Sequence, residues 1–383
     1  MPFEFSDNQT ELRDWIKSFV AENVAPRDKW MDENGFDREL YEKMCGNGLI
    51  GLSFPAQYGG GDADTVTRTM VIEEIAKGSA SAAFFLGAHW LAAGCVLSEG
   101  SEQQKAKYMP LAAVGKIFAF GLTEESGGSD AAGIQSVAVR SGDGWLLSGG
   151  KLWITNSGVA DYYIILAKTA PDKGAHGISA FIVPSDAPGL TVGPFERKMG
   201  MRGATTCKLS FESVQLPADA LLGVENKGFK LAMRSLDGAR ITIAALASGI
   251  AQHAFSVAKA HALQRRTFGK LLSEHEAIQF TFADMAVKLS ACHLLTYDAA
   301  RMRDRGDAHT LEASKAKLFC TEACSFITNK CLQILGGNGY SQEYDCEQLV
   351  RDCRVLEICE GSNEIQRIVI AGNILRQDSA QLY

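Results

Sequence analysis

The sequence predicts a mixed fold that is mainly α-helical: a helical domain over residues 1–117, a β-domain over 118–225 and a four-helix bundle over 226–383. Three observations predict this order. The first stretch has helical periodicity broken by loops, the second has short β-branched and aromatic runs separated by Gly, Pro, Asp and Ser, and the third returns to long helical repeats. A chain of 383 residues is long enough for two or three such domains.

The first helix is expected almost at the start of the chain. Ser6 and Gln9 have the spacing of a capping box, in which each side chain bonds the other residue's backbone N–H. The order of charged, apolar and small residues that marks a signal peptide is missing, so we expect mature structure from near the first residue. Apolar residues follow at helical spacing: Leu12, Trp15, Ile16, Phe19, Val20 and Val24.

Gly46, Gly48 and Gly51 match the GxGxxG fingerprint of dinucleotide-binding folds. That fingerprint requires a strand before it and a helix after it. Here the glycines follow a helical segment and lead into the extended stretch LSFPAQYGG. The pattern therefore predicts the end of a helix and a loop.

Six short runs in the second stretch predict strands, because each is rich in β-branched or aromatic residues and is bounded by turn residues. In the third stretch, an apolar seam from Ile278 to Cys292 and three further segments predict four long helices of an antiparallel bundle. The strand runs are 117–123, 136–141, 144–149, 162–170, 177–183 and 207–216, and the further helical segments are 228–262, 312–335 and 345–375.

Composition narrows the classes of partner. Hydrophobic residues make up 46% and charged residues 22%, as in a globular protein, and the formal charge is −7 without a basic block, so we expect no nucleic-acid partner. No apolar run approaches the roughly 18–20 residues of a membrane span, so none is expected. The ten cysteines form no CxxC pair and the histidines no HExxH motif, so we expect buried free thiols and no metal site.

Two segments of the β-domain combine small, polar and aromatic residues. In FGLTEESGGSD (120–130), Thr123 and Ser129 offer hydroxyls, and two glycines allow the backbone to approach a phosphate or a flat ring; a polar β-turn fits equally well. In GGKLWITNSG (149–158), Trp153 and Thr155 are two residues apart and are expected on one strand face, which suits the face and edge of an isoalloxazine ring. A lone Trp–Thr pair is more often part of a core.

Three segments of the bundle carry further candidates. Arg265 and Arg266 end one helix, where they either offset the helix dipole or clamp a pyrophosphate. QILGGNGY (333–340) closes another helix, for which a glycine C-cap is the simple explanation. In EICEGSNEIQRIVIAGNIL (357–375), Glu360 precedes a glycine inside an apolar stretch, where a lone glutamate is usually a helix-end charge.

Taken together and in this order, the five segments resemble the acyl-CoA dehydrogenase flavoprotein family over essentially the whole chain. The resemblance implies the three-domain fold above, FAD as cofactor and assembly as a homotetramer. It implies contacts to FAD within the subunit from Phe120, Leu122, Thr123, Gly128, Ser129, Trp153, Ile154 and Thr155. It also implies contacts to the FAD of a neighbouring subunit from Arg265, Arg266, Thr267, His275, Gln333, Gly336 and Gly337, with Gly361, Ser362 and Glu364 following the same adenosine end.

Glu360 matches the family's catalytic base, which takes the α-proton of an acyl-CoA while the β-hydrogen leaves as hydride to N5 of FAD. One subgroup carries its base at the position of Ala239, which cannot serve here. The departures are Cys359, where many members have Tyr, and Glu276, where Gln is common. Substrate contacts are implied for Ser129, Asp237, Arg240 and Gly361.

The resemblance also implies electron-transfer flavoprotein as partner, and a bacterial cytoplasm or an organellar matrix as location. The segment 79–95, with Phe84, Phe85 and Trp90 and no Arg or Lys, is expected to shape the acyl pocket and to favour a short, branched or cyclic acyl group. Three alternatives remain: an acyl-CoA oxidase, a desulfinase-type relative, or a non-catalytic scaffold of the same fold.

Overall fold

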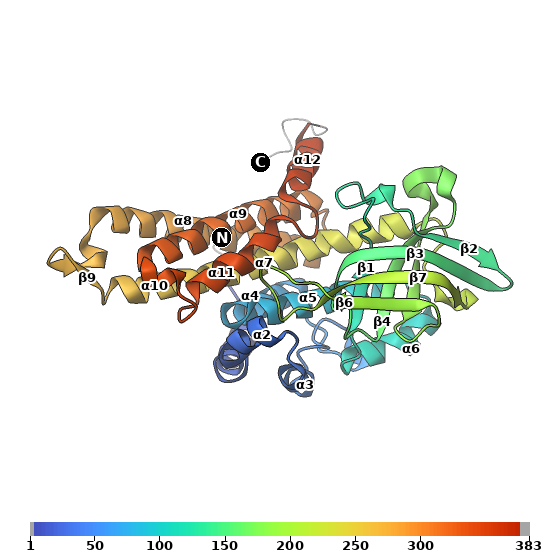
Figure 1. Cartoon of the computed structure of the whole chain (residues 1–383), viewed down its shortest axis with the longest axis horizontal. Coiled ribbons are helices and arrows are strands. Elements are labelled where there is room, and N and C mark those ends of the chain that lie inside the picture. The colour runs from blue at the N-terminus through green and yellow to red at the C-terminus, as the bar shows by residue number, and fades with distance from the viewer. Residues whose placement is uncertain (1–3, 376–383) are drawn as a thin grey trace.

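The computed structural model describes residues 4–375 and confirms a mainly helical fold built around one β-sheet (Figure 1). The sheet lies at one end of the molecule and the long helices extend toward the other. The expected domain borders at 117/118 and 225/226 fall between α6 (Glu102–Ala113) and β1 (Phe118–Gly121) and between β8 (Leu221–Leu222) and α7 (Gly228–Ala262). The outermost parts of the first and last expected domains, 1–3 and 376–383, lie outside the described residues.

The N-terminal part is helical, and its first helix begins at the expected capping box. The Ser6 hydroxyl accepts from the Gln9 N–H at 3.3 Å, and the Gln9 side chain accepts from the Ser6 N–H at 3.1 Å. Gly46 ends a helix and Gly48 follows with φ +73°, so the glycine pattern is a helix end, as predicted. The helices are α1 (Asp7–Phe19), α2 (Asp28–Asn34), α3 (Arg38–Gly46), α4 (Thr65–Gly78), α5 (Ala80–Glu99) and α6 (Glu102–Ala113).

The central sheet has the strand order β6-β7-β3-β2-β4-β5-β8, with β1 pairing in parallel with β4. All six expected strand runs form strands, whereas β6 and β8 were not predicted. β6 is an edge strand that contains Gly193 and Pro194 and is largely exposed, so it lacks the apolar alternation that predicts a strand. The strands are β1 (Phe118–Gly121), β2 (Val137–Ser141), β3 (Gly144–Thr155), β4 (Tyr162–Lys168), β5 (Ile178–Pro184), β6 (Leu190–Phe195), β7 (Thr206–Leu216) and β8 (Leu221–Leu222).

The bundle contains three long helices, and the prediction of a fourth over 345–375 is wrong. That segment forms α11 (Cys346–Cys353), a 3₁₀ turn (Arg354–Glu357) and α12 (Asn363–Ile374), because Glu360 and Gly361 have left-handed φ values of +53° and +87° that no right-handed helix accommodates. The remaining elements are α7 (Gly228–Ala262), β9 (Arg266–Thr267), β10 (Lys270–Leu271), α8 (Glu276–Asp304), α9 (Thr310–Leu335) and α10 (Gly337–Tyr340).

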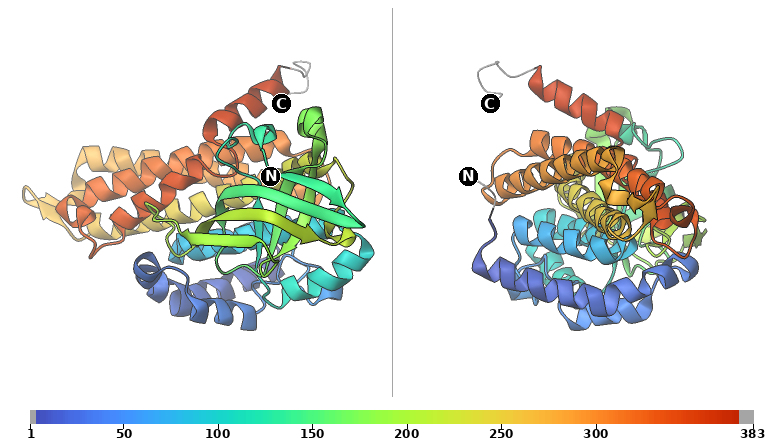
Figure 2. Two further views of the ribbon diagram at one scale, coloured as in Figure 1. Left: turned by 45° about the vertical axis from the view of Figure 1, so that its right-hand side comes forward. Right: turned by 90° about the vertical axis from the view of Figure 1, so that its left-hand side faces the viewer.

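Helix α7 links the parts of the molecule. It packs against α4 and α5 on one side and against α9 and α8 on the other, and the end-on view of Figure 2 shows it between these layers. Both α5 and α7 are long and apolar enough to cross a membrane, with mean hydropathy of 1.6 and 1.4, so the expectation that no apolar run reaches this length is wrong. Their most apolar windows are 78% and 67% buried inside the protein, as in core helices that are covered on most sides.

Candidate functional site

Glu360 lies on a tight turn between the 3₁₀ turn that follows α11 and the start of α12. The left-handed φ of +53° is uncommon for a residue with a side chain and costs about 1–2 kcal/mol. The Ser362 hydroxyl caps α12 by accepting from the Ile365 N–H at 3.5 Å. The turn therefore holds the Glu360 side chain in a fixed, strained position at the helix N-terminus.

The Glu360 carboxylate is half-buried, and it forms no hydrogen bond or ion pair with any other residue between 4 and 375. Burial raises its pKa to about 7, and the positive charges of Lys317 and Arg240 act in the opposite direction. A carboxylate with these properties exists in both protonation states near neutral pH, and its lone pairs are free. These are the properties of a general base.

Lys317 of α9 was not singled out in the sequence, yet it is fully buried beside this turn. Its Nζ donates to the Gly361 carbonyl and to Asn363 Oδ1, each at 2.9 Å, and Asn363 Nδ2 donates to the Thr321 hydroxyl at 3.0 Å. Gln366 Nε2 donates to the Gly361 carbonyl at 2.9 Å. A sequence signal existed: Lys317 lies four residues from both Ala313 and Thr321, on the buried face of α9.

Arg240 and Asp237 lie together on α7. Arg240 Nη1 donates to Asp237 Oδ1 at 2.7 Å and to the Ser314 hydroxyl at 3.2 Å, while its buried Nε has no partner among the described residues. The Thr310 hydroxyl donates to the second Asp237 oxygen at 2.7 Å. The guanidinium is buried, and its charge acts on Glu360, so these two of the four expected substrate residues lie on the Glu360 side of the bundle.

The structure brings together the two segments of the β-domain that were expected to contact a cofactor, 120–130 and 149–158. The Leu152 N–H donates to the Thr123 carbonyl at 2.9 Å, and the buried Lys151 ammonium donates to the Leu122 carbonyl at 3.1 Å. Trp153 is 61% exposed, with φ +59°, at an irregularity of pairing between Lys151 and Ile154. The pleat is irregular at the tryptophan, yet Trp153 and Thr155 are both accessible on either side of the buried Ile154, which is compatible with the expected common face.

Around these segments, Phe120, Thr123 and Thr155 are partly exposed, and Gly128 and Ser129 are exposed in the turn. The side chains of Leu122 and Ile154 are buried in the core, so these two residues present backbone groups only. An exposed indole beside a glycine-containing turn fits a flat aromatic ring that carries a phosphate chain.

The other expected cofactor residues lie elsewhere. The β9–β10 hairpin and α10 are at the end of the bundle opposite to the sheet (Figure 1), so one protomer does not join them to Trp153. Arg265 and Arg266 are exposed, and the Thr267 hydroxyl lies 3.1 Å from His275 Nε2. Gln333, Gly336 and Gly337 at the end of α9 are exposed at the same extremity, whereas Gly361, Ser362 and Glu364 adjoin Glu360.

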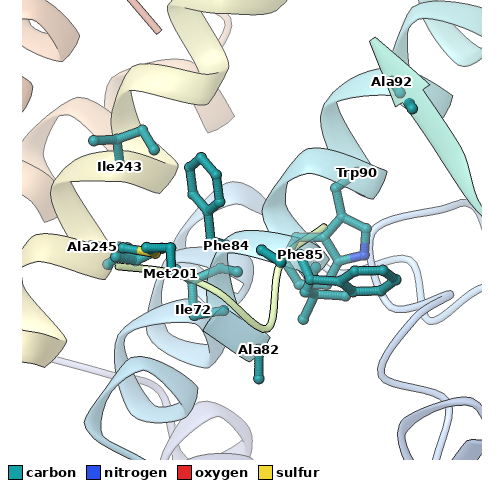
Figure 3. Close-up of a cluster of buried hydrophobic side chains, with 14 of the residues drawn as sticks. Ile72, Ala82, Phe84, Phe85, Trp90, Ala92, Met201, Ile243 and Ala245 are labelled. Atoms are coloured by element: carbon teal, nitrogen blue, oxygen red, sulfur yellow. The ribbon is translucent and has the colours of Figure 1, made fainter. Parts of the chain in front are cut away.

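The three aromatic residues expected at the acyl pocket point in two directions (Figure 3). Phe85 packs against Phe36 and Tyr41 at centroid distances of 5.1 and 5.3 Å, and Trp90 donates to the Ile50 carbonyl at 2.8 Å, so both face the N-terminal helices. Only Phe84 points toward α7.

Glu360 lines neither of two well-formed surface hollows in the described part of the chain. One, of about 560 Å³, lies between the end of α2 and residues 195–206, with Asp32, Lys198 and Arg202 in its wall. The other, of about 440 Å³, lies between residues 158–163 and β6.

Three family models match successive parts of the chain. They describe the acyl-CoA dehydrogenase N-terminal domain at residues 6–116, the middle domain at 119–214 and the C-terminal domain at 226–375. The chain belongs to the acyl-CoA dehydrogenase family. Its members are oxidoreductases with FAD as cofactor, and this chain is an enzyme of that class.

Individual relatives agree over nearly the full length. A probable acyl-CoA dehydrogenase of Bacillus subtilis is 41% identical over 98% of this chain and 100% of its own. Butyryl-CoA dehydrogenase from Megasphaera elsdenii superposes with a TM-score of 0.95 at 39% identity, covering 98% and 100% of the two chains. A structure described as the electron transferring flavoprotein of Acidaminococcus fermentans superposes with a TM-score of 0.96 at 38% identity and the same coverage.

Proposed function

We propose that this acyl-CoA dehydrogenase removes the α-proton of a short acyl-CoA with Glu360 and forms the 2-enoyl thioester. The observation that carries the proposal is the half-buried, unpaired Glu360 carboxylate, whose pKa burial raises to about 7. Ala239, which occupies the alternative base position of the family, has no ionisable group.

The α-proton of an acyl thioester is weakly acidic, and two properties of the Glu360 turn favour its removal. The raised pKa makes Glu360 a stronger base than a carboxylate in water, by about 1.4 kcal/mol per unit. The Glu360 N–H has no acceptor in the described part of the chain, so it is free to donate to the thioester oxygen as negative charge develops there. One such donor is typically worth roughly 3–4 kcal/mol in the transition state.

FAD is proposed to lie against Trp153, Thr155 and the 120–129 turn, and when bound it supplies the acceptor for the β-hydride. Because the hairpin arginines and the 333–337 stretch lie at the far end of the protomer, we propose that they hold the FAD of a neighbouring subunit. Gly361, Ser362 and Glu364 adjoin both the base and the start of α12, where N–H groups suit an anionic part of a ligand.

We propose a homotetramer. Phe280, Val287 and Leu294 recur at seven-residue spacing along α8 and are 62%, 70% and 56% exposed in the isolated chain, which makes a stripe suited to a second copy. Electron-transfer flavoprotein is the proposed electron acceptor, and the bacterial relatives support a cytoplasmic location.

The acyl group is proposed to be short. The Megasphaera relative is named for a butyryl substrate, and Phe84 is the aromatic residue of 79–95 that points toward α7. Since Phe85 and Trp90 face the N-terminal helices, their bulk is no argument for a branched or cyclic acyl group.

The test is Glu360→Gln, with the exposed Glu322→Gln as matched control. Both variants are expected to purify with FAD. Anaerobic mixing with butyryl-CoA and longer or branched acyl-CoAs should bleach the flavin of the control, while the rate in Glu360→Gln falls at least about 1,000-fold. Undiminished bleaching in Glu360→Gln would end the assignment of the base. Rapid oxygen consumption by reduced wild type would indicate an oxidase.

A further inference from the structure

Lys317 is a buried cation that no step of the proposed reaction uses. It is fully buried in α9, and no carboxylate lies within ion-pair distance of its Nζ in the described part of the chain. Its two acceptors are neutral, the Gly361 carbonyl and Asn363 Oδ1, each at 2.9 Å. Burying an ammonium group without a carboxylate partner is unfavourable, so packing alone does not account for a lysine here.

Both acceptors of Lys317 belong to the turn that carries Glu360. Gly361 directly follows the base with φ +87°, and Asn363 is the first residue of α12. The Gly361 carbonyl accepts from Lys317 and from Gln366 together. Of these two donors, only Lys317 comes from another helix, so it fixes the turn relative to the bundle.

The charge of Lys317 also reaches Glu360. Lys317 on α9 and Arg240 on α7 are the cations that face the carboxylate; Asp237 neutralises much of Arg240. The thiols of Cys95 on α5 and Cys359 beside the base also face it, and burial raises the pKa of each to about 12, so both are neutral. The Glu357 carboxylate also acts on Lys317 through space, but it forms no ion pair with it. Lys317 is therefore the cation next to the base that has no carboxylate in ion-pair contact within the described part of the chain.

We propose that Lys317 is a positioning residue for the dehydrogenation: it holds the Glu360–Asn363 turn against α9 so that the carboxylate faces the substrate, and its charge favours the ionised base. This inference rests on the proposed role of Glu360. It separates two contributions of one side chain, the hydrogen bonds to the turn and the positive charge.

Two substitutions separate these contributions. Lys317→Gln retains a donor for the turn and removes the charge, whereas Lys317→Met removes both. Lys315→Met, two residues away on the partly exposed face of α9, is the matched control. The pH dependence of anaerobic flavin reduction by butyryl-CoA, the FAD content and the melting temperature are measured for all variants.

Removing the charge raises the pKa of Glu360, so the rising limb of the rate should move to higher pH by about one unit in both Lys317 variants. Above that limb, Lys317→Gln should approach the wild-type rate, whereas Lys317→Met should stay at least about 10-fold slower because its turn is no longer held. FAD content should be unchanged, and Lys315→Met should match wild type.

If the rate rises at the same pH as in wild type in both Lys317 variants, the charge has no role. If Lys317→Met reaches the wild-type rate at high pH, the positioning role is overturned. If Lys317→Met does not fold, the pH at which the rate of Lys317→Gln rises still decides the role of the charge. A rate of Lys317→Gln well below that of wild type at high pH would then contradict positioning through hydrogen bonds. Glu360→Gln is measured in parallel. If it remains active, the proposed function fails; if it is inactive while the Lys317 variants match wild type, only this inference fails.

Discussion

The Lys151 ammonium and the Glu124 carboxylate form an ion pair inside the β-domain, with side-chain exposures of 0% and 6%. Glu124 also accepts from the backbone N–H groups of Gln135 and Ser136. The pair thereby ties the turn before Ser129 to the strand that carries Trp153, the two segments proposed to border FAD.

Removal of either residue of the Lys151–Glu124 ion pair should lower the free energy of unfolding. Lys151→Met leaves the Glu124 carboxylate buried without its cation and is expected to lower the free energy of unfolding by about 3–5 kcal/mol. Urea unfolding measures this loss. Lys151→Met combined with Glu124→Gln should lose less than the sum of the single variants. Lys105→Met, which breaks an exposed pair with Glu102, should cost under about 1 kcal/mol; a similar cost for Lys151→Met would contradict the importance of the buried pair.

The pH dependence of the wild type should report the raised pKa of Glu360. The base must be ionised to accept a proton, so the rate of flavin reduction by butyryl-CoA should rise with pH through about 7 and then level off. Stopped-flow measurements at constant ionic strength, from about two pH units below the expected midpoint to about two units above it, check this. A limb near the ordinary pKa of a glutamate would mean that burial does not perturb this carboxylate.

Stability should change with pH in the opposite sense. The folded-state pKa of Glu360 lies above its unfolded value of 4.5, so the favourable contribution of its protonated form is complete below pH 4.5 and is lost as pH rises through about 7. The Glu360→Gln variant has no carboxylate to ionise, so its free energy of unfolding does not fall in this way. Relative to wild type, the variant should gain up to about 3 kcal/mol at pH 8 and little at pH 4. Melting curves at both values test this, and an equal gain at both pH values would contradict it.

Cofactor affinity should depend on the far end of the bundle. Arg266→Ala is expected to weaken FAD binding roughly 10- to 100-fold, the usual value of a charge-assisted hydrogen bond. Retention of FAD should also fall on dilution, because the arginine is proposed to act on the FAD of a neighbouring subunit. Lys270→Ala, on the same hairpin, is the control and should retain FAD. Fluorescence of released FAD measures both variants, and unchanged retention in Arg266→Ala would remove this arginine from the site.

Elements with strong local signals were predicted from the sequence. The Ser6–Gln9 capping box, the six strand runs and the inward seam of α8 each depend on neighbouring residues, and each is present. The wrong predictions arise where tertiary contacts override local pattern. The fourth helix is interrupted at Glu360 because side chains from α9 and α12 hold a left-handed turn there.

In the candidate site too, some residues are indicated by local sequence, whereas their contacts depend on the tertiary fold. Motif residues such as Trp153 and Glu360 are visible in the sequence, but the break in the pleat at Trp153 depends on pairing with a distant strand. The spacing of Lys317 on α9 indicates burial, but its contact with the Glu360 turn depends on two acceptors 44 and 46 residues further along the chain. Likewise, the apolarity of α5 could not be assigned to a core until the helices that cover it were known.

The placement of the hairpin and the sheet at opposite extremities of one protomer has a genetic consequence. If the hairpin holds the FAD of a neighbouring subunit and Glu360 is the base, as proposed, a subunit with a defective base still contributes an intact hairpin, and a subunit with a defective hairpin still contributes an intact base. Two inactive alleles, one at Glu360 and one at Arg266, should therefore complement each other when co-expressed. Random mixing would restore roughly a quarter of the sites, each assembled from the sound halves of two different polypeptides.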